Sequence, residues 1–430
     1  MVVLLRTDSH ANASPVGDFL AQRFRLDNGL TLIHQQVPAA PVVTVDVWVK
    51  AGAIVEPEPW AGMAHFLEHM VFKGTDQLPP GSFDYVIESR GGMANAATSH
   101  DYAHFFINTA AVDLPETLPY LAELLLNAAI PDGEFELERD VVLEEIRQSL
   151  DDPDMLGFQA LLETAYLRHP YGRPVLGDAA GLLERSPEEM RQFHRTYYQP
   201  ENMTIVLVGD VDWESTLALV DRYFNAFAPR AACPCPMVEP EHSLTEIRRQ
   251  EFCLPDLGLA RLMMAWVCPG VDSLRSAYGL DLLSVILSGG RTARLVRELR
   301  EERQLVQDIS SGFSLQKDSS LFTLTAWLDP DHLDAVEAII GDRLTELAHV
   351  PVADAELARY KRLLQNDYAF STETTSQLAG LYGYYNTIAD AELSAQYPTT
   401  IQSFDTAELQ DLARQHLSPL RYAVTVMKPC

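Results

Sequence analysis

The sequence predicts an α+β protein built from two related domains, and three observations support this. Both halves of the chain mix strand-like and helix-like segments. Residues 229–240 contain four prolines and two cysteines and interrupt the pattern near the middle of the chain. Each half ends with a helical segment followed by an apolar strand, residues 202–208 in the first and 420–426 in the second. We therefore predict an N-terminal arm (1–22), a first α+β domain (23–228), a linker (229–245) and a second α+β domain (246–430).

The elements expected in the first half follow from periodicity and turn signals. Asn28-Gly29 between apolar residues is typical of a hairpin turn. Apolar and polar residues alternate over 43–49, which predicts a half-buried strand. Further strands are expected over 93–98, 103–109 and 203–210. Helices are expected over 63–73, 82–90, 114–128, 134–150, 187–198 and 213–227.

The second half repeats this order loosely. Strands are expected over 261–267, 309–315, 321–328 and 422–427. An apolar helix is expected over 274–287 and a charged helix over 292–303, with two long helices before the final strand. Residue identity between the halves is weak, so the similarity is one of plan.

Composition limits the partners. The chain has 61 acidic and 32 basic residues and a formal net charge of −29, which argues against nucleic acid as a ligand. A solvated acidic surface explains this charge, and the alternative is an acidic chamber that attracts basic peptides. No apolar run approaches the length of about 20 residues that spans a bilayer. Five cysteines cannot all pair, so we expect reduced thiols and a cytoplasmic protein without a membrane span.

The most informative motif is His65-x-x-Glu68-His69. No Gly or Pro interrupts residues 63–73, and two His four residues apart lie one above the other on a helix. Two neutral imidazoles on one face can share a metal ion, and Glu68 is placed to accept a proton from a water molecule there. The order is the inverse of the familiar HExxH zinc helix. A catalytic zinc needs a third protein ligand.

The charged helix over 134–150 offers that ligand. Asp140, Glu144 and Arg147 share a polar stripe, which is typical of a solvent-facing surface. Glu138 and Glu145 are seven residues apart and share a stripe with Val141, Val142 and Ser149. Carboxylates on an inward face need a partner, because an unpaired buried charge is costly. We therefore predict Glu145 as the third ligand and Glu138 as a supporting group, with an ordinary surface charge as the alternative for Glu138.

A third feature is the strand over 93–98, which contains Asn95, Ala96 and Thr98. Its residues are small and polar for a core strand, so we expect it at the edge of a sheet. An exposed edge can add an extended peptide as a further strand. A plain edge strand without ligand is the alternative.

Taken together, several stretches resemble the M16 family of zinc metallopeptidases, also called the pitrilysin or inverzincin family. The likeness is strongest to mitochondrial processing peptidase and its bacterial relatives, and it extends from about Phe24 to the C-terminus. The residues that carry it are His65 to Thr75, Gly92 to Thr98, Glu138 to Ile146, His169 to Pro174 and Tyr197 to Asp210.

The resemblance implies a zinc-dependent endopeptidase acting on peptides or targeting segments. It implies that His65, His69 and Glu145 bind Zn²⁺, that Glu68 is the general base and that Glu138 supports catalysis. It also implies that the strand containing Asn95, Ala96 and Thr98 pairs with the substrate backbone. The expected fold is two related α/β-sandwich domains, and two such subunits pair as a clamshell around a chamber.

One departure from the family pattern concerns the partner. Family members carry an Arg and a Tyr seven residues apart in the second domain, and that pair helps to bind substrate across the chamber. Here Arg300 fits, but Gln307 stands where Tyr is expected. We therefore expect a heterodimer with a related subunit, and a homodimer is the alternative.

Two other functions compete with the peptidase. The first is a catalytically silent structural or partner subunit of an M16-type complex, but such subunits usually lose the metal motif. The second is the small lyase that shares HxxEH, against which the two-domain length argues.

Overall fold

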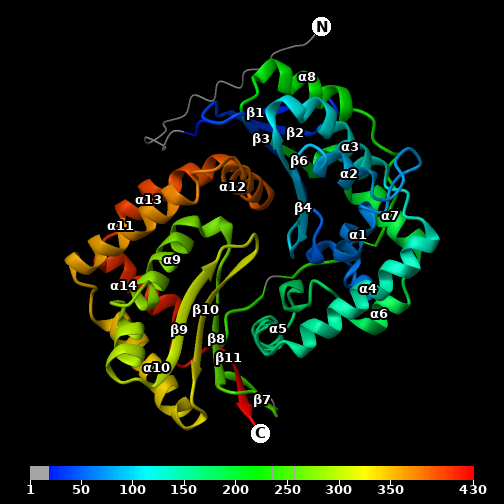
Figure 1. Ribbon diagram of the computed structural model, residues 1–430. Coiled ribbons are helices and arrows are strands. Elements are labelled where there is room, and N and C mark those ends of the chain that lie inside the picture. The colour runs from blue at the N-terminus through cyan, green and yellow to red at the C-terminus, as the bar shows by residue number, and fades with distance from the viewer. Residues whose placement is uncertain (1–18, 235, 240, 256) are drawn as a thin grey trace.

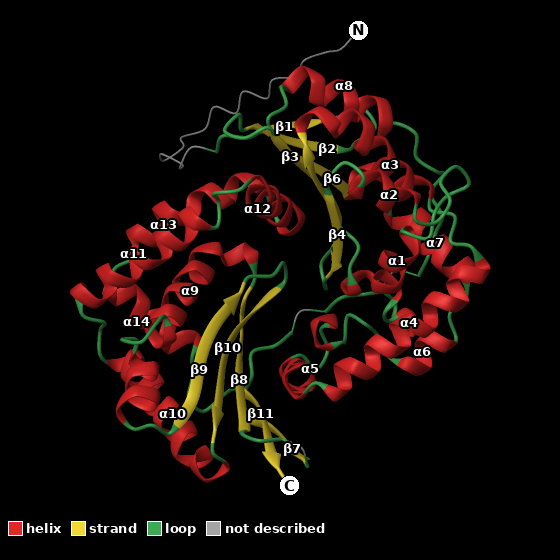
Figure 2. Ribbon diagram, viewed as in Figure 1, coloured by secondary structure: helices red, strands yellow, loops and turns green. Residues whose placement is uncertain are grey.

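A computed structural model describes residues 19–234, 236–239, 241–255 and 257–430. Residues 1–18 of the predicted arm and Cys235 lie outside this range. The described chain forms two α+β domains, with the strands toward the middle of the molecule and most helices on the outside (Figures 1 and 2). Among the described residues no helix is both long and apolar enough to cross a membrane.

The first domain contains a six-stranded sheet in the order β1-β2-β6-β3-β5-β4. Its strands are β1 (Gln22–Arg25), β2 (Thr31–Gln36), β3 (Val42–Val49), β4 (Met93–Thr98), β5 (Ala103–Ala110) and β6 (Met203–Gly209). Its helices are α1 (Met63–Val71), α2 (Ser82–Glu88), α3 (Leu114–Asn127), α4 (Asp132–Asp151), α5 (Pro153–Ala165), α6 (Ala179–Leu183), α7 (Pro187–Tyr197) and α8 (Trp213–Tyr223).

The second domain contains a five-stranded sheet in the order β7-β11-β8-β10-β9. Its strands are β7 (Arg248–Leu254), β8 (Ala260–Pro269), β9 (Val306–Ser314), β10 (Ser319–Leu328) and β11 (Ala423–Pro429). Its α-helices are α9 (Leu274–Ser288), α10 (Leu333–His349), α11 (Asp354–Phe370), α12 (Thr375–Ile388), α13 (Tyr397–Ser403) and α14 (Thr406–His416).

Apart from β1, which has no counterpart in the second sheet, the two sheets share one topology, and this confirms the predicted repeat of plan. The parallel pair β2/β6 corresponds to the parallel pair β7/β11. The antiparallel neighbours β6-β3-β5-β4 correspond in order to β11-β8-β10-β9. Strand β4 is therefore an edge strand, as expected, and β9 is its counterpart in the second domain.

One helix of each domain packs on the sheet of the other domain, which the sequence did not predict. Helix α5 packs on β8 and β11, and α12 packs on β3 and β6 (Figure 1). A glycine permits each close approach. A Cβ at Gly157 would lie 2.4 Å from Met427 Sδ, and one at Gly383 would lie 2.0 Å from Trp48 Nε1. These exchanged helices hold the two domains together and so fix the position of the first sheet.

Four sequence-based expectations about the fold differ from the structure. The strand expected to be half-buried over 43–49 is buried on both faces, because α12 packs on the face that carries Thr44, Asp46 and Trp48. In place of the charged helix expected over 292–303 there is a π-helix over Val296–Glu302, and its residues Val296 and Leu299 are buried in the core. More than two long helices precede the last strand. Cys253 and Cys430 form a disulfide, contrary to the expected reduced thiols. Reducing compartments disfavour disulfides, so this pair removes the support that cysteine usage lent to a cytoplasmic location.

Candidate metal centre

Helix α1 carries the HxxEH motif, and its N-terminus is held by a buried carboxylate. The backbone N–H groups of Gly62 and Ala64 donate to the two carboxylate oxygens of Glu56 over 3.0 and 2.7 Å. Burial raises the pKa of Glu56 to about 7, against the opposing effect of these hydrogen bonds. Gly62 has φ 89°, and a Cβ there would lie 2.5 Å from the Leu176 carbonyl oxygen. A glycine is therefore required where the chain enters the helix.

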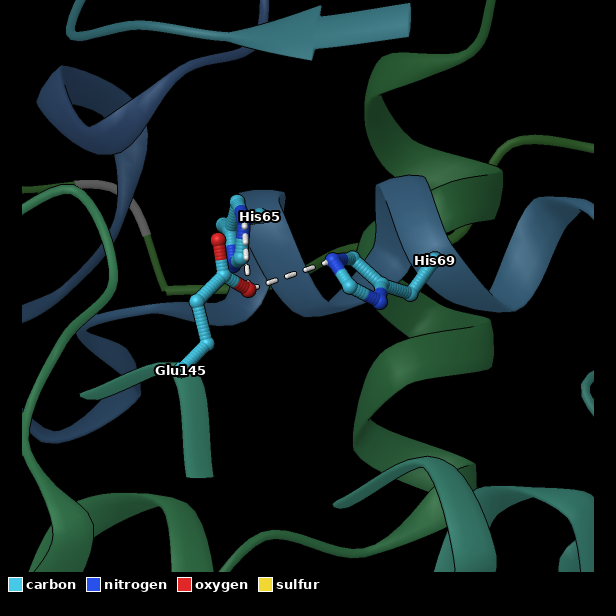
Figure 3. Close-up of side chains that lie close together, drawn as sticks. All are labelled: His65, His69 and Glu145. Carbon is cyan, nitrogen blue, oxygen red and sulfur yellow. Dashed lines mark ion pairs between the residues drawn. The ribbon is translucent and has the colours of Figure 1, made fainter. Parts of the chain in front are cut away.

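Three predicted ligands converge at one point between α1 and α4 (Figure 3). The Nε2 atoms of His65 and His69 each lie 3.6 Å from Glu145 Oε2, and one ligand atom from each residue lies within 4.8 Å of the others. Two ligands at zinc–ligand distances in a tetrahedral site are separated by about 3.4 Å, so this spacing suits the ion. Within the described residues this is the group of His, Cys, Asp or Glu side chains with metal-binding spacing.

The protonation state of His65 also suits a metal ligand. Burial, and then the neighbouring His69, lower the pKa of His65 to about 4. The imidazole is therefore neutral at pH 7 and keeps a lone pair. Two imidazole nitrogens and one carboxylate oxygen form a donor set that zinc favours.

Glu138 lies behind His69, and Lys73 holds it there. Glu138 Oε1 lies 2.9 Å from His69 Nδ1, and Glu138 Oε2 lies 2.5 Å from Lys73 Nζ. Burial alone would raise the pKa of Glu138, but the hydrogen bonds from Lys73 and His69 lower it overall. An ionised Glu138 accepts a hydrogen bond from Nδ1–H of His69, and in that tautomer Nε2 is free to bind a metal.

Glu68 lies on the same helix, next to His69. Thr98, the last residue of β4, donates a hydrogen bond of 2.5 Å from its hydroxyl to Glu68 Oε2. Burial raises the pKa of Glu68, although Thr98 and His69 oppose the shift. A partly buried carboxylate beside the metal-ligand group can act as an acid or a base there.

The predicted substrate-binding residues are divided between the domains. Asn95, Ala96 and Thr98 lie on β4, which pairs only with β5 and leaves its other edge unpaired within the described chain. Arg300 lies on the π-helix of the second domain, where it pairs with Glu301 and Asp308 at 3.1 Å each. Within the described residues no ion pair or hydrogen bond brings Arg300 to the triad.

One face of α4 is less buried than the sequence predicted. Val141 is 51% exposed, whereas Val142 is buried, so the stripe that contains Glu138 and Glu145 is not apolar along its length. Glu145 faces the two His because α4 crosses α1, not because both of its valine neighbours are buried. The side chain of Glu144 is 55% exposed and pairs with Arg147, as the sequence predicted for a solvent-facing residue.

Sequence reasoning overlooked the roles of Lys73 and Glu56. The spacing His65, His69, Lys73 is four residues at each step and could have placed Lys73 on the ligand face. Glu56 is separated from α1 by a loop, and no local pattern indicates that a distant glutamate caps this helix.

The chain combines a two-domain α+β fold with His, His and Glu side chains that converge between two helices, so it belongs to the class of proteins with a candidate metal centre. The family model described as Insulinase (Peptidase family M16) matches residues 31–179, and the model described as Peptidase M16 inactive domain matches residues 185–364. Together these two models span most of the chain, which therefore belongs to the M16 peptidase family.

Relatives agree with this assignment. The chain is 28% identical over 418 residues to an uncharacterized zinc protease of Mycobacterium tuberculosis, covering 97% of this chain and 95% of the relative. It is 29% identical over 411 residues to the zinc protease PqqE of Helicobacter pylori, covering 94% and 92%. The crystal structure of a protease from Helicobacter pylori superposes with a TM-score of 0.89 at 27% identity, covering 95% and 99%.

Proposed function

We propose that this protein is a zinc-dependent endopeptidase that cleaves peptides or targeting segments in a chamber formed with a second M16-type subunit. The observation that carries the proposal is the convergence of His65, His69 and Glu145 beside Glu68. The names of the relatives, which call them zinc proteases, support the metal and the reaction class.

The residues have distinct roles in this proposal. Zinc bound by the triad would polarise the scissile carbonyl and make water more acidic. Glu68 takes a proton from the attacking water, whose oxygen forms a bond to the carbonyl carbon. The same carboxyl then gives that proton to the amine nitrogen as the C–N bond breaks. Thr98 orients Glu68 through its hydroxyl.

The substrate would bind as a strand. The unpaired edge of β4 offers backbone N–H and C=O groups to an extended peptide. Thr98 ends this strand and touches Glu68, so a peptide paired with β4 would pass the proposed base. Asn95 and Ala96 would hold the peptide in register further along the edge.

The alternative function is a catalytically silent partner subunit. The description of the second family model as an inactive domain gives this alternative its support. That model covers residues 185–364, whereas the triad and Glu68 lie within the region matched by the other model. A silent subunit has no need for three convergent ligands, so we favour the enzyme.

The test separates metal binding from catalysis by three substitutions. Glu145→Gln should remove zinc and activity, while Glu144→Gln, its exposed neighbour, should keep both. Glu68→Gln should keep zinc and lose activity by a factor of roughly 10²–10⁴, the usual contribution of a positioned base. Zinc content and cleavage of a quenched fluorescent peptide are measured for each. The proposal fails if a zinc-loaded Glu68→Gln variant turns over at the wild-type rate, or if Glu145→Gln and Glu144→Gln exchange their outcomes.

A further inference from the structure

Two rows of side chains face each other where α1 crosses α4. On the α1 side, His65, His69 and Lys73 follow one another at intervals of four residues, with Lys73 just beyond the C-terminal end of the helix. On the α4 side, Glu138 and Glu145 are seven residues apart. Glu145 faces the two His, and Glu138 faces His69 and Lys73. The pair of Glu138 and Lys73 lies next to the proposed metal ligands, with Lys73 four residues after His69 in the chain.

Both oxygens of the Glu138 carboxylate are engaged. One lies 2.9 Å from His69 Nδ1 and the other 2.5 Å from Lys73 Nζ. The side chain of Glu138 is 11% exposed and that of Lys73 is 28% exposed, so solvent competes little for either group. A carboxylate held at both oxygens cannot turn about its terminal bond without losing one partner.

We propose that Lys73 is a positioning residue for zinc binding, acting through Glu138. By holding one carboxylate oxygen, Lys73 keeps the other directed at His69 Nδ1. That contact orients the His69 ring and presents Nε2 toward His65 and Glu145. This inference rests on the proposed function, because it assumes that the triad binds zinc.

Removing Lys73 leaves Glu138 without a cation. A buried carboxylate that loses its partner carries an uncompensated charge, so it turns toward solvent or another donor. The hydrogen bond to His69 Nδ1 is then lost or lengthened, and the ring gains freedom to rotate. Groups that orient a ligating His in this way typically change metal affinity by about 10–100-fold when they are replaced.

The experiment measures the zinc dissociation constant of the full chain by competition with a chromogenic chelator. Lys73→Met should weaken zinc binding about 10-fold or more. Lys73→Arg keeps a cation within reach of Glu138 and should restore most of the affinity. Lys428→Met is the matched control, because it removes an exposed Lys–Glu pair, the one with Glu251 at 2.8 Å in the second domain. It should leave the zinc dissociation constant unchanged.

A double-variant comparison tests whether Lys73 acts through Glu138. Glu138→Gln alone should weaken zinc binding, and adding Lys73→Met should cause no further loss. The visible absorption spectrum of the Co²⁺-loaded protein gives a second readout, since its bands depend on the geometry of the ligands. They should change in Lys73→Met and return in Lys73→Arg. If Lys73→Met does not fold, Lys73→Gln replaces it in both measurements.

Several outcomes overturn the inference. One is a Lys73→Met variant whose zinc affinity and Co²⁺ spectrum equal those of the wild type. Another is an additive loss in the double variant, which would mean that Lys73 acts by a different route. These results leave the proposed function intact. A wild-type chain that binds no zinc would instead remove both the proposed function and this inference.

Discussion

Replacing Glu56 with glutamine should change how the stability of the metal-free protein depends on pH. The Glu56 side chain is buried, and its two oxygens accept hydrogen bonds from the backbone N–H groups of Gly62 and Ala64. Glutamine has nearly the same shape but does not titrate. It offers one oxygen acceptor and one NH₂ group, and that NH₂ group cannot accept the second backbone hydrogen bond.

The size of the pH-dependent change in the free energy of unfolding follows from the shift in the pKa of Glu56. Burial raises the pKa of Glu56 from 4.5 to about 7, so between these values the folded protein holds a proton that the unfolded chain has released. The free energy of unfolding of the wild type therefore falls as pH rises through this window, and the loss is complete above the folded-state pKa. At 1.36 kcal/mol per pKa unit, the contribution lost between pH 5 and pH 8 is about 2–3 kcal/mol.

The Glu56→Gln variant has no titrating group at this position, so its free energy of unfolding should not fall in this way as pH rises. It should be less stable than the wild type at pH 5 by about 1–3 kcal/mol, the cost of one unsatisfied buried group. Between pH 5 and pH 8 the free energy of unfolding of the variant, relative to that of the wild type, should rise by about 2–3 kcal/mol.

The assay is denaturant unfolding of both chelator-treated proteins at pH 5 and pH 8. Glu58→Gln, an exposed neighbour, is the control and should follow the wild type at both pH values. A wild-type-to-variant difference that is equal at the two pH values would refute the reasoning, because it would mean that Glu56 does not titrate in this window.

Two further predictions concern substrate and partner. If the net charge of −29 extends into the proposed chamber, peptides with Lys or Arg near the cut should be cleaved faster than acidic ones at low salt. The preference should fade as the screening length falls to about 8 Å at 0.15 M salt. Equal rates for basic and acidic peptides at low salt would mean that the acidic residues only form a solvated surface. The lone chain should be weakly active, because Gln307 stands where the resemblance to the family places a Tyr that would add a donor, a kind of contact worth roughly 10²–10³ in rate. A large gain in peptide cleavage on adding a related subunit, or on Gln307→Tyr, supports a heterodimer, whereas full activity of the lone chain that Gln307→Tyr does not change contradicts it.

Local spacing determined much of this protein from sequence alone. The interval between His65 and His69 places both rings on one helical face whatever surrounds the helix. The small residues of 93–98 predicted the edge strand β4 correctly. Alternation over 43–49 predicted the strand β3, but the expectation that it is half-buried was wrong, because α12 covers its second face. The choice of Glu145 over Glu144 also came from helical spacing, although the burial argued for Val141 was wrong.

Only the tertiary structure decided which distant groups meet. Glu138 is 69 residues from His69 in the chain. The sequence around these two residues does not indicate that Lys73 pairs with the second carboxylate oxygen of Glu138. Helices α5 and α12 each lie on the sheet of the other domain, where Gly157 and Gly383 permit close contact. Helical and strand periodicity depend on near neighbours in the chain, whereas these contacts depend on how whole elements cross in space, and no periodicity in the sequence encodes that.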